Sequence, residues 1–165
     1  MIKGGQCYTT LEGALQDVFE YPTEDLWICW NGSFIPVGYK YDLSWMIDEL
    51  QDLIECLVSK TEGQHRAEFS SDTFMVNWSL SWKEDALRVT SEWKSITGSC
   101  QDKLNGEDGV LEVSKRTFLC EWKRPLKLVL SALDLGGYTN ENLPESERLQ
   151  KLYSLIPQEG YCYVR

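Results

Sequence analysis

The chain has 165 residues, of which 42% are hydrophobic and 12% are aromatic, so it is too apolar for a disordered protein. A chain of this length can bury a core of its own, and we expect a single domain over residues 1–165. The formal net charge of −10 argues against a surface for nucleic acid or anionic membrane, because such surfaces depend on clustered lysine and arginine.

The N-terminal part of the chain predicts a short helix. Thr9 and Glu12 have the spacing of a capping box, in which each side chain bonds to the backbone of the other residue. Apolar side chains then recur at helical intervals up to Phe19, and Tyr21-Pro22 disfavours helical backbone. We therefore expect a first helix over residues 10–20.

A β-hairpin is predicted next. Residues 26–30, LWICW, form an apolar run, and Asn31-Gly32 is the strongest two-residue hairpin signal. The sequence SFIPVGY then returns as the second strand. Because Pro36 has no N–H to give to a strand ladder, we expect this strand to lie at a sheet edge or to carry a bulge.

The clearest helical periodicity lies in residues 43–60, after Asp42, which is a favourable N-cap. Apolar residues there follow the i, i+3, i+4, i+7 rule over about four turns. They are Leu43, Met46, Ile47, Leu50, Leu53, Ile54, Leu57 and Val58. The opposite face carries Asp48, Glu49, Asp52 and Glu55, so the pattern predicts an amphipathic helix with an acidic outer face.

A two-residue period follows, after a short strand predicted at residues 65–71. Apolar and polar side chains alternate from Phe74 to Trp82 and again from Leu87 to Trp93, which predicts an antiparallel hairpin. Its apolar face holds Phe74, Val76, Trp78, Leu80, Trp82, Leu87, Val89 and Trp93. Such a strip is an aggregation hazard in water, so we expect it to lie under the helix of residues 43–60. A solvent-facing aromatic platform is the alternative, and the polar face is either solvated or a docking surface.

The last third of the chain predicts one more strand and two more helices. Residues 98–109 are rich in turn formers and predict an exposed loop, and VLEV, residues 110–113, follows as a strand. Residues 118–133 keep helical spacing across Pro125, which requires a kink or two abutting helices, until Gly136-Gly137 ends the pattern. A last helix precedes Pro157, and YCYVR at the end of the chain is a candidate strand.

Together these elements predict the α+β class, with an antiparallel sheet of about five strands and helices packed on one face. No stretch approaches the about 20 apolar residues that a bilayer span needs, and the first ten residues contain no apolar run of signal-peptide length. We therefore expect a soluble protein of the cytoplasm with no membrane partner.

The cysteines leave two interpretations open. Six are present, an even number that fits a disulfide framework. Their gaps are wide and irregular and two of them have apolar neighbours, which favours reduced, mostly buried thiols. They are Cys7, Cys29, Cys56, Cys100, Cys120 and Cys162. No CxxC pair is present and His65 is the only histidine, so we predict no metal site and no cofactor.

The sequence contains no recognisable catalytic motif. No context singles out a cysteine as the partner of His65, and the glycine pairs match neither a P-loop nor a dinucleotide-binding fingerprint. Carboxylates are so numerous, at 26 in the chain, that paired acids will occur by chance. We therefore predict that the protein is not an enzyme, with a small hydrolase as the less favoured alternative.

The size, the acidity and the style of the whole chain, including FLCEWKRPLKLVLSAL at residues 118–133, resemble those of bacterial immunity proteins. These proteins neutralise the toxins of contact-dependent inhibition and other polymorphic toxin systems. The resemblance implies stoichiometric binding to a cognate toxin domain, a nuclease for example, that blocks its active site or its access to substrate. A structural or adaptor protein is the alternative, with the polar sheet face or the basic helix of residues 115–127 as its docking surface.

The acidic side chains are the candidate contacts for a basic toxin domain, because opposite charges speed association. The helix supplies Asp48, Glu49, Asp52 and Glu55, and the loop supplies Asp102, Glu107 and Asp108. We also expect Tyr39 and Tyr41 to be exposed and to act as aromatic anchors, since binding hot spots favour tyrosine and tryptophan.

Overall fold

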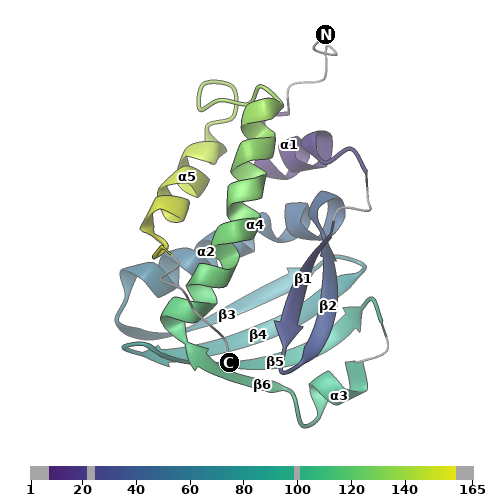
Figure 1. The fold of residues 1–165 in the computed structure, drawn as a ribbon, viewed down its shortest axis with the longest axis vertical. Helices are drawn as coiled ribbons and strands as arrows, with labels where there is room; N and C mark the ends of the chain where they lie inside the picture. Colours follow the sequence, from purple (N-terminus) through teal and green to yellow (C-terminus); the bar gives the residue numbers. More distant parts are fainter. Residues whose placement is uncertain (1–7, 22–24, 99–100, 159–165) are drawn as a thin grey trace.

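A computed structural model describes residues 8–21, 25–98 and 101–158. Helices and strands alternate irregularly along this part of the chain (Figure 1). In chain order they are α1 (Leu11–Val18), β1 (Asp25–Trp30), β2 (Ser33–Gly38), the π-helical turn η1 (Tyr39–Leu43), α2 (Ser44–Ser59), β3 (Glu62–Ser70), β4 (Phe74–Lys83), β5 (Ala86–Ile96), α3 (Gln101–Asn105), β6 (Val110–Ser114), α4 (Lys115–Leu135) and α5 (Glu145–Leu155).

The predicted α+β class is confirmed, with all the described strands antiparallel. The strands divide into two sheets: β1 and β2 form a separate hairpin, and the larger sheet has the order β3-β4-β5-β6. Helices α1, α2, α4 and α5 lie on one face of the larger sheet, and the hairpin lies on that same side (Figure 1). This arrangement leaves the other face of the larger sheet uncovered by any described helix.

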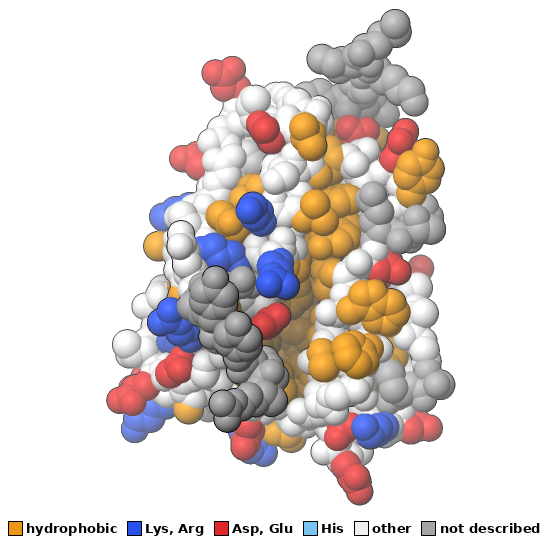
Figure 2. Space-filling view, viewed as in Figure 1, with side chains coloured by type: hydrophobic (Ala, Val, Ile, Leu, Met, Phe, Trp, Pro, Cys, Tyr) orange, Lys and Arg blue, Asp and Glu red, His pale blue; other side chains and the backbone are white. Residues whose placement is uncertain are grey.

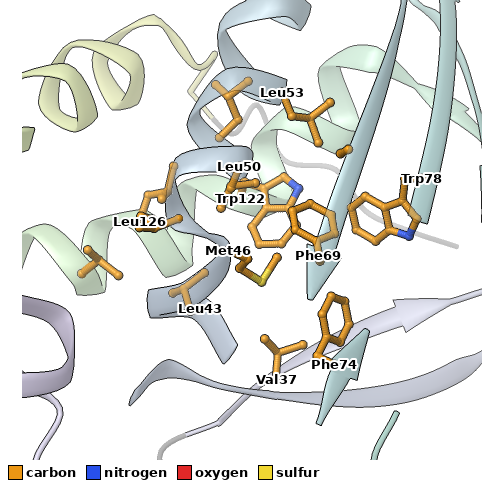
Figure 3. Packing of buried hydrophobic residues seen from close by; sticks show 14 of the residues in the cluster. Val37, Leu43, Met46, Leu50, Leu53, Phe69, Phe74, Trp78, Trp122 and Leu126 are labelled. Carbon is orange, nitrogen blue, oxygen red and sulfur yellow. The ribbon is translucent and has the colours of Figure 1, made fainter. Parts of the chain in front are cut away.

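The tryptophan-rich ribbon forms the floor of the core, as the two-residue period predicts. Trp78 and Trp93 are 1% exposed and Phe74 is fully buried. Trp30 reaches in from the hairpin and stacks on Trp78, with ring centroids 5.4 Å apart, and meets Trp93 edge-on at the same distance. The apolar side of α2 packs down onto these rings (Figure 3). The alternative of a solvent-facing aromatic platform on this ribbon is therefore wrong.

The entry to α2 differs from the prediction. Asp42 is not an N-cap: the chain passes through the π-helical turn η1, and α2 begins at Ser44. The Asp42 side chain is buried and accepts hydrogen bonds from the Gly38 N–H at 2.8 Å, from the Thr73 hydroxyl at 2.6 Å and from the Ser71 hydroxyl. Asp42 therefore ties the end of β2 to the turn between β3 and β4.

Three smaller features also differ from the sequence predictions. The cap of α1 is Thr10, whose hydroxyl accepts the Gly13 N–H at 3.2 Å, and not Thr9. Helix α4 is one helix across Pro125, so of the two predicted alternatives, a kink or two abutting helices, the second is wrong. The predicted loop of residues 98–109 contains the short helix α3, held to β5 by Asn105, whose side chain bonds to the backbone of Trp93 in both directions at 2.7 Å.

The three cysteines in the described part of the chain do not share the predicted burial. Cys120 is buried and Cys56 is half-buried, whereas Cys29 is exposed on β1. Cys7, Cys100, Cys162 and the strand predicted at YCYVR fall outside the described residues. Among the helices of residues 8–21, 25–98 and 101–158, none has the length and apolarity to cross a membrane.

Candidate protein-interaction surface

The exposed side of η1 and α2 carries a continuous stripe of aromatic and acidic side chains, which we call the α2 stripe. Its members recur every three or four residues and so share one side of the helix. They are Tyr41, Trp45, Asp48, Asp52 and Glu55, and all five are exposed. The residues between them face inward and supply part of the core, for example Met46 and Leu50.

The aromatic end of the α2 stripe consists of Tyr41 and Trp45, which are 52% and 61% exposed. The expectation of an exposed Tyr41 is confirmed, but the same expectation for Tyr39 is wrong. Tyr39 is buried, and its ring stacks on Phe19 of the segment after α1, with centroids 4.8 Å apart. Trp45 is the aromatic group that sequence reasoning missed, although it has helical spacing with Asp48.

The acidic end of the α2 stripe is partly neutralised from α5. The Arg148 guanidinium donates to the Asp52 carboxylate at 2.6 Å and also to the Glu55 carboxylate. The hydrogen bond to Glu55 is the main reason that the pKa of Arg148 is raised above its ordinary value. Both acids remain about half exposed, so one cation is shared between two carboxylates and the stripe keeps a negative charge.

Asp48 lies at the centre of the α2 stripe in an unfavourable setting for its charge. Burial raises the pKa of the Asp48 carboxyl, the neighbouring carboxylates of Glu145 and Asp52 raise it further, and Arg148 opposes them. The described contact of this carboxyl is a hydrogen bond of 3.3 Å from the Gln51 amide. Folding therefore places this acid where ionisation costs free energy, which an opposite charge on a partner would relieve.

Glu49 belongs to a different side of α2. Its carboxylate is half-buried and lies 3.7 Å from Nε2 of His65 on β3. This pair connects α2 with the edge strand β3 and is not part of the α2 stripe. Of the four predicted helix acids, the structure thus brings Asp48, Asp52 and Glu55 together and separates Glu49 from them.

The three predicted loop acids do not join the α2 stripe. Helix α2 packs beside β3, whereas α3 and its loop lie against β5 (Figure 1). Asp102 and Glu107 are exposed, but Asp108 is structural: its carboxylate pairs with Lys103 at 2.8 Å, and its carbonyl accepts the Trp30 indole N–H at 2.7 Å. The loop acids therefore form a separate surface near the tip of the hairpin.

The hairpin carries a second group of exposed apolar side chains that the sequence analysis did not single out. Trp27 and Phe34 are 61% and 66% exposed, and they flank the exposed Cys29 on the outer side of β1 and β2. Figure 2 shows hydrophobic side chains gathered over this hairpin. The sequence does not indicate their direction, because residues 26–30 are all apolar; only the burial pattern shows that Leu26, Ile28 and Trp30 point inward.

The described residues show no cluster of three metal-ligating side chains. His65 has no hydrogen-bond partner at Nε2 within that part of the chain, and its described ionic neighbour is Glu49. In comparisons with known proteins, no protein family, no curated protein and no solved structure matches this chain.

Proposed function

We propose that this protein is a stoichiometric protein-binding inhibitor, an immunity protein that neutralises a cognate toxin domain by covering its active site or its access to substrate. The main support for the proposal is the α2 stripe, in which two exposed aromatic side chains, one on η1 and one on α2, are followed by three carboxylates on α2. A rigid helix with aromatic anchors at one end and like charges at the other suits a protein partner with an apolar pocket and a basic surface.

Two further observations support this choice of surface. Helix α2 is held on several sides, by α1, α5 and β3, so its exposed stripe is presented without rearrangement. Asp48 is kept in a site that disfavours its charge, which an ordinary solvated helix face would not require. Cationic groups of a toxin would meet that charge, and the chain's net charge of −10 would steer them toward it.

The test is binding between this protein and the variable C-terminal domain of a secreted protein encoded immediately upstream. We expect a one-to-one complex, and we expect Trp45→Ala to weaken it about 10- to 100-fold, as for a hot-spot tryptophan. The double variant Asp48→Lys/Asp52→Lys should slow association about tenfold or more at low salt, with a smaller effect at high salt.

The loop acids supply the matched control, because they are exposed and lie on a separate surface. The variant Asp102→Lys/Glu107→Lys changes the net charge by the same amount and should affect binding much less. A larger loss from this control than from the α2 variants would move the interface to the loop. The absence of any complex with the adjacent toxin domain would refute the proposed function.

A further inference from the structure

Strand β3 forms one edge of the larger sheet, and its outer side is long and regular. It has nine residues, and β4 is its one partner among the described strands, in an unbroken register from Glu62 to Ser70. Proline residues and β-bulges are usual devices that prevent a further strand from adding to an edge, and β3 contains neither. The opposite edge strand, β6, has five residues. Strand β3 therefore offers the longer template for strand addition.

The backbone groups of β3 that point away from β4 can be identified. The Glu84 N–H donates to the Thr61 carbonyl at 2.7 Å, so these two residues form a hydrogen-bonded pair at the end of the ladder. Because such pairs alternate with non-hydrogen-bonded pairs, the odd-numbered residues of β3 bond to β4. The N–H and C=O groups of the even-numbered residues therefore point to the free edge. These residues are Glu62, Gln64, Arg66, Glu68 and Ser70.

The side chains beside this row of backbone groups are polar on the outer face of the sheet. All five even-numbered residues of β3 are exposed there. On the inner face Ala67 and Phe69 are buried in the core, and α2 packs beside β3 on that side (Figure 1). A strand that adds to β3 therefore gains backbone hydrogen bonds, and the exposed polar side chains decide which strand is compatible.

Arg66 and Glu68 give the edge a charge pattern that is complementary to itself. Within one chain the two side chains form an exposed ion pair, with Arg66 Nε 2.9 Å from Glu68 Oε1. When two β3 strands pair antiparallel with Ala67 opposite the Ala67 of a second copy, each Arg66 lies directly opposite the other copy's Glu68. Directly opposite Cβ atoms are about 4.5–5.5 Å apart, closer than the about 6.6 Å between residues two apart on one strand. Each charge thus gains a second and closer partner.

The other registers of two β3 strands are less favourable. Pairing over the whole strand places Arg66 opposite the Arg66 of the second copy. A shift by two residues to the other side of that register places Glu62 opposite Glu68, and like charges directly opposite each other are destabilising. A register that pairs Glu62 with Arg66 aligns opposite charges, but it joins only residues 62–66, whereas the register centred on Ala67 joins residues 64–70.

We infer that the free edge of β3 binds a second copy of this chain, with Ala67 at the twofold axis, so that two four-stranded sheets join into one. The small side chain of Ala67 suits this position, because the Cα atoms of a non-hydrogen-bonded pair are only about 4.5 Å apart. The edge has no exposed apolar anchor and each copy has a net charge of −10, so the dimer is weak. We expect a dissociation constant of about 10–300 µM at physiological salt.

The test is sedimentation equilibrium of the full-length protein at concentrations up to about 1 mM. Glu68→Lys places a lysine opposite the second copy's Arg66 and should weaken the dimer about tenfold or more, and Arg66→Glu should do the same through two facing glutamates. The double variant Arg66→Glu/Glu68→Lys restores opposite charges and should return the dissociation constant to within about threefold of the original. Glu62→Lys is the matched control, because it changes the charge of the same strand equally but lies outside residues 64–70.

Amide exchange checks the register. The N–H groups of Gln64, Arg66 and Glu68 become paired in the dimer, so their exchange should slow about threefold or more as the protein concentration rises through the dissociation constant, whereas that of Glu62 should not. The inference is overturned by a protein that stays monomeric at about 1 mM, by a double variant that does not recover dimerisation, or by an equal loss in Glu62→Lys. No toxin domain takes part in these measurements, so their outcome is separate from the test of the proposed function.

Discussion

Removal of the Asp42 carboxylate should be among the most destabilising polar changes in this protein. The side chain is 5% exposed and accepts three hydrogen bonds, from one backbone N–H and two hydroxyls. A hydrogen bond to a charged group contributes about 1.5–3 kcal/mol, and a buried donor left without a partner costs about 1–3 kcal/mol. The stabilising free energy of these three hydrogen bonds is therefore larger than that of an ordinary exposed acid.

The net loss in Asp42→Ala is smaller than the sum of three such bonds. Ser71 keeps a second contact, because its hydroxyl also accepts the Phe74 N–H at 2.9 Å, and the exposed Thr73 can bond to water. We therefore expect Asp42→Ala to lower the free energy of unfolding by about 3–4 kcal/mol. Asp42→Asn keeps the volume but turns an amide donor toward groups that are themselves donors, and it should cost about 2 kcal/mol.

The assay is equilibrium unfolding in urea, followed by circular dichroism. With a denaturant slope of about 2 kcal/mol/M, the midpoint of Asp42→Ala should fall by about 1.5–2 M. Asp72→Ala is the control, since Asp72 is an exposed acid on the same β3–β4 turn and should change stability by less than about 0.5 kcal/mol. If the two variants unfold at the same urea concentration, the buried network does not hold the end of β2 to the turn.

Three other changes test separate parts of the structure. Trp78→Ala removes a ring that contacts Trp30, Phe69 and Trp93, and it should cost about 3–5 kcal/mol in the same unfolding assay. Trp78→Phe should cost clearly less, because it also removes a buried indole N–H that has no hydrogen-bond partner among the described residues. Arg148→Ala breaks two partly exposed ion pairs and should lower stability by less than about 1 kcal/mol, while speeding association with a basic partner. Asp48→Asn should raise stability at pH 7, because a carboxyl whose pKa is raised in the folded state destabilises the fold when it is ionised. This gain in stability should shrink as the pH falls toward about 3.9, the ordinary pKa of aspartate, and it should vanish below that pH. A gain that persists at pH 3 would show that the charge of Asp48 is not its cause.

The periodicities of the sequence predict the core well because they are local consequences of helix and strand geometry. The alternation from Phe74 to Trp93 places each indole of that ribbon on the inner face, and the helical repeat of residues 43–60 covers it. Asn31-Gly32 likewise predicts its turn, in which both residues adopt positive φ angles of 46° and 81°. Such local patterns do not predict that the strands divide into two sheets, because this division depends on contacts between residues far apart in the chain.

The wrong predictions for Asp42 and Tyr39 also result from long-range contacts. An aspartate before an amphipathic helix is equally compatible with an N-cap and with a buried acceptor, and for Asp42 its hydroxyl partners, Ser71 and Thr73, lie about thirty residues away. The burial of Tyr39 depends in the same way on Phe19, across the hairpin that separates them in the chain. In both cases the local sequence determines the element, while a distant side chain determines the exposure.

The exposed Trp45, in contrast, can be found from the sequence, because it has helical spacing with Asp48 and Asp52, whereas the apolar run around Trp27 gives no such signal. Trp45 and Trp27 each occupy an outward position between buried or half-buried neighbours. Burying a large apolar side chain contributes about 1.5–3 kcal/mol, so a tryptophan left 61% exposed contributes little of this to the fold. Replacing either with glutamine should therefore leave stability within about 0.5 kcal/mol, whereas the buried indoles cannot be replaced at so small a cost. Any loss of binding in Trp45→Gln or Trp27→Gln can then be assigned to the surface itself, to the α2 stripe in the first case and to the hairpin in the second.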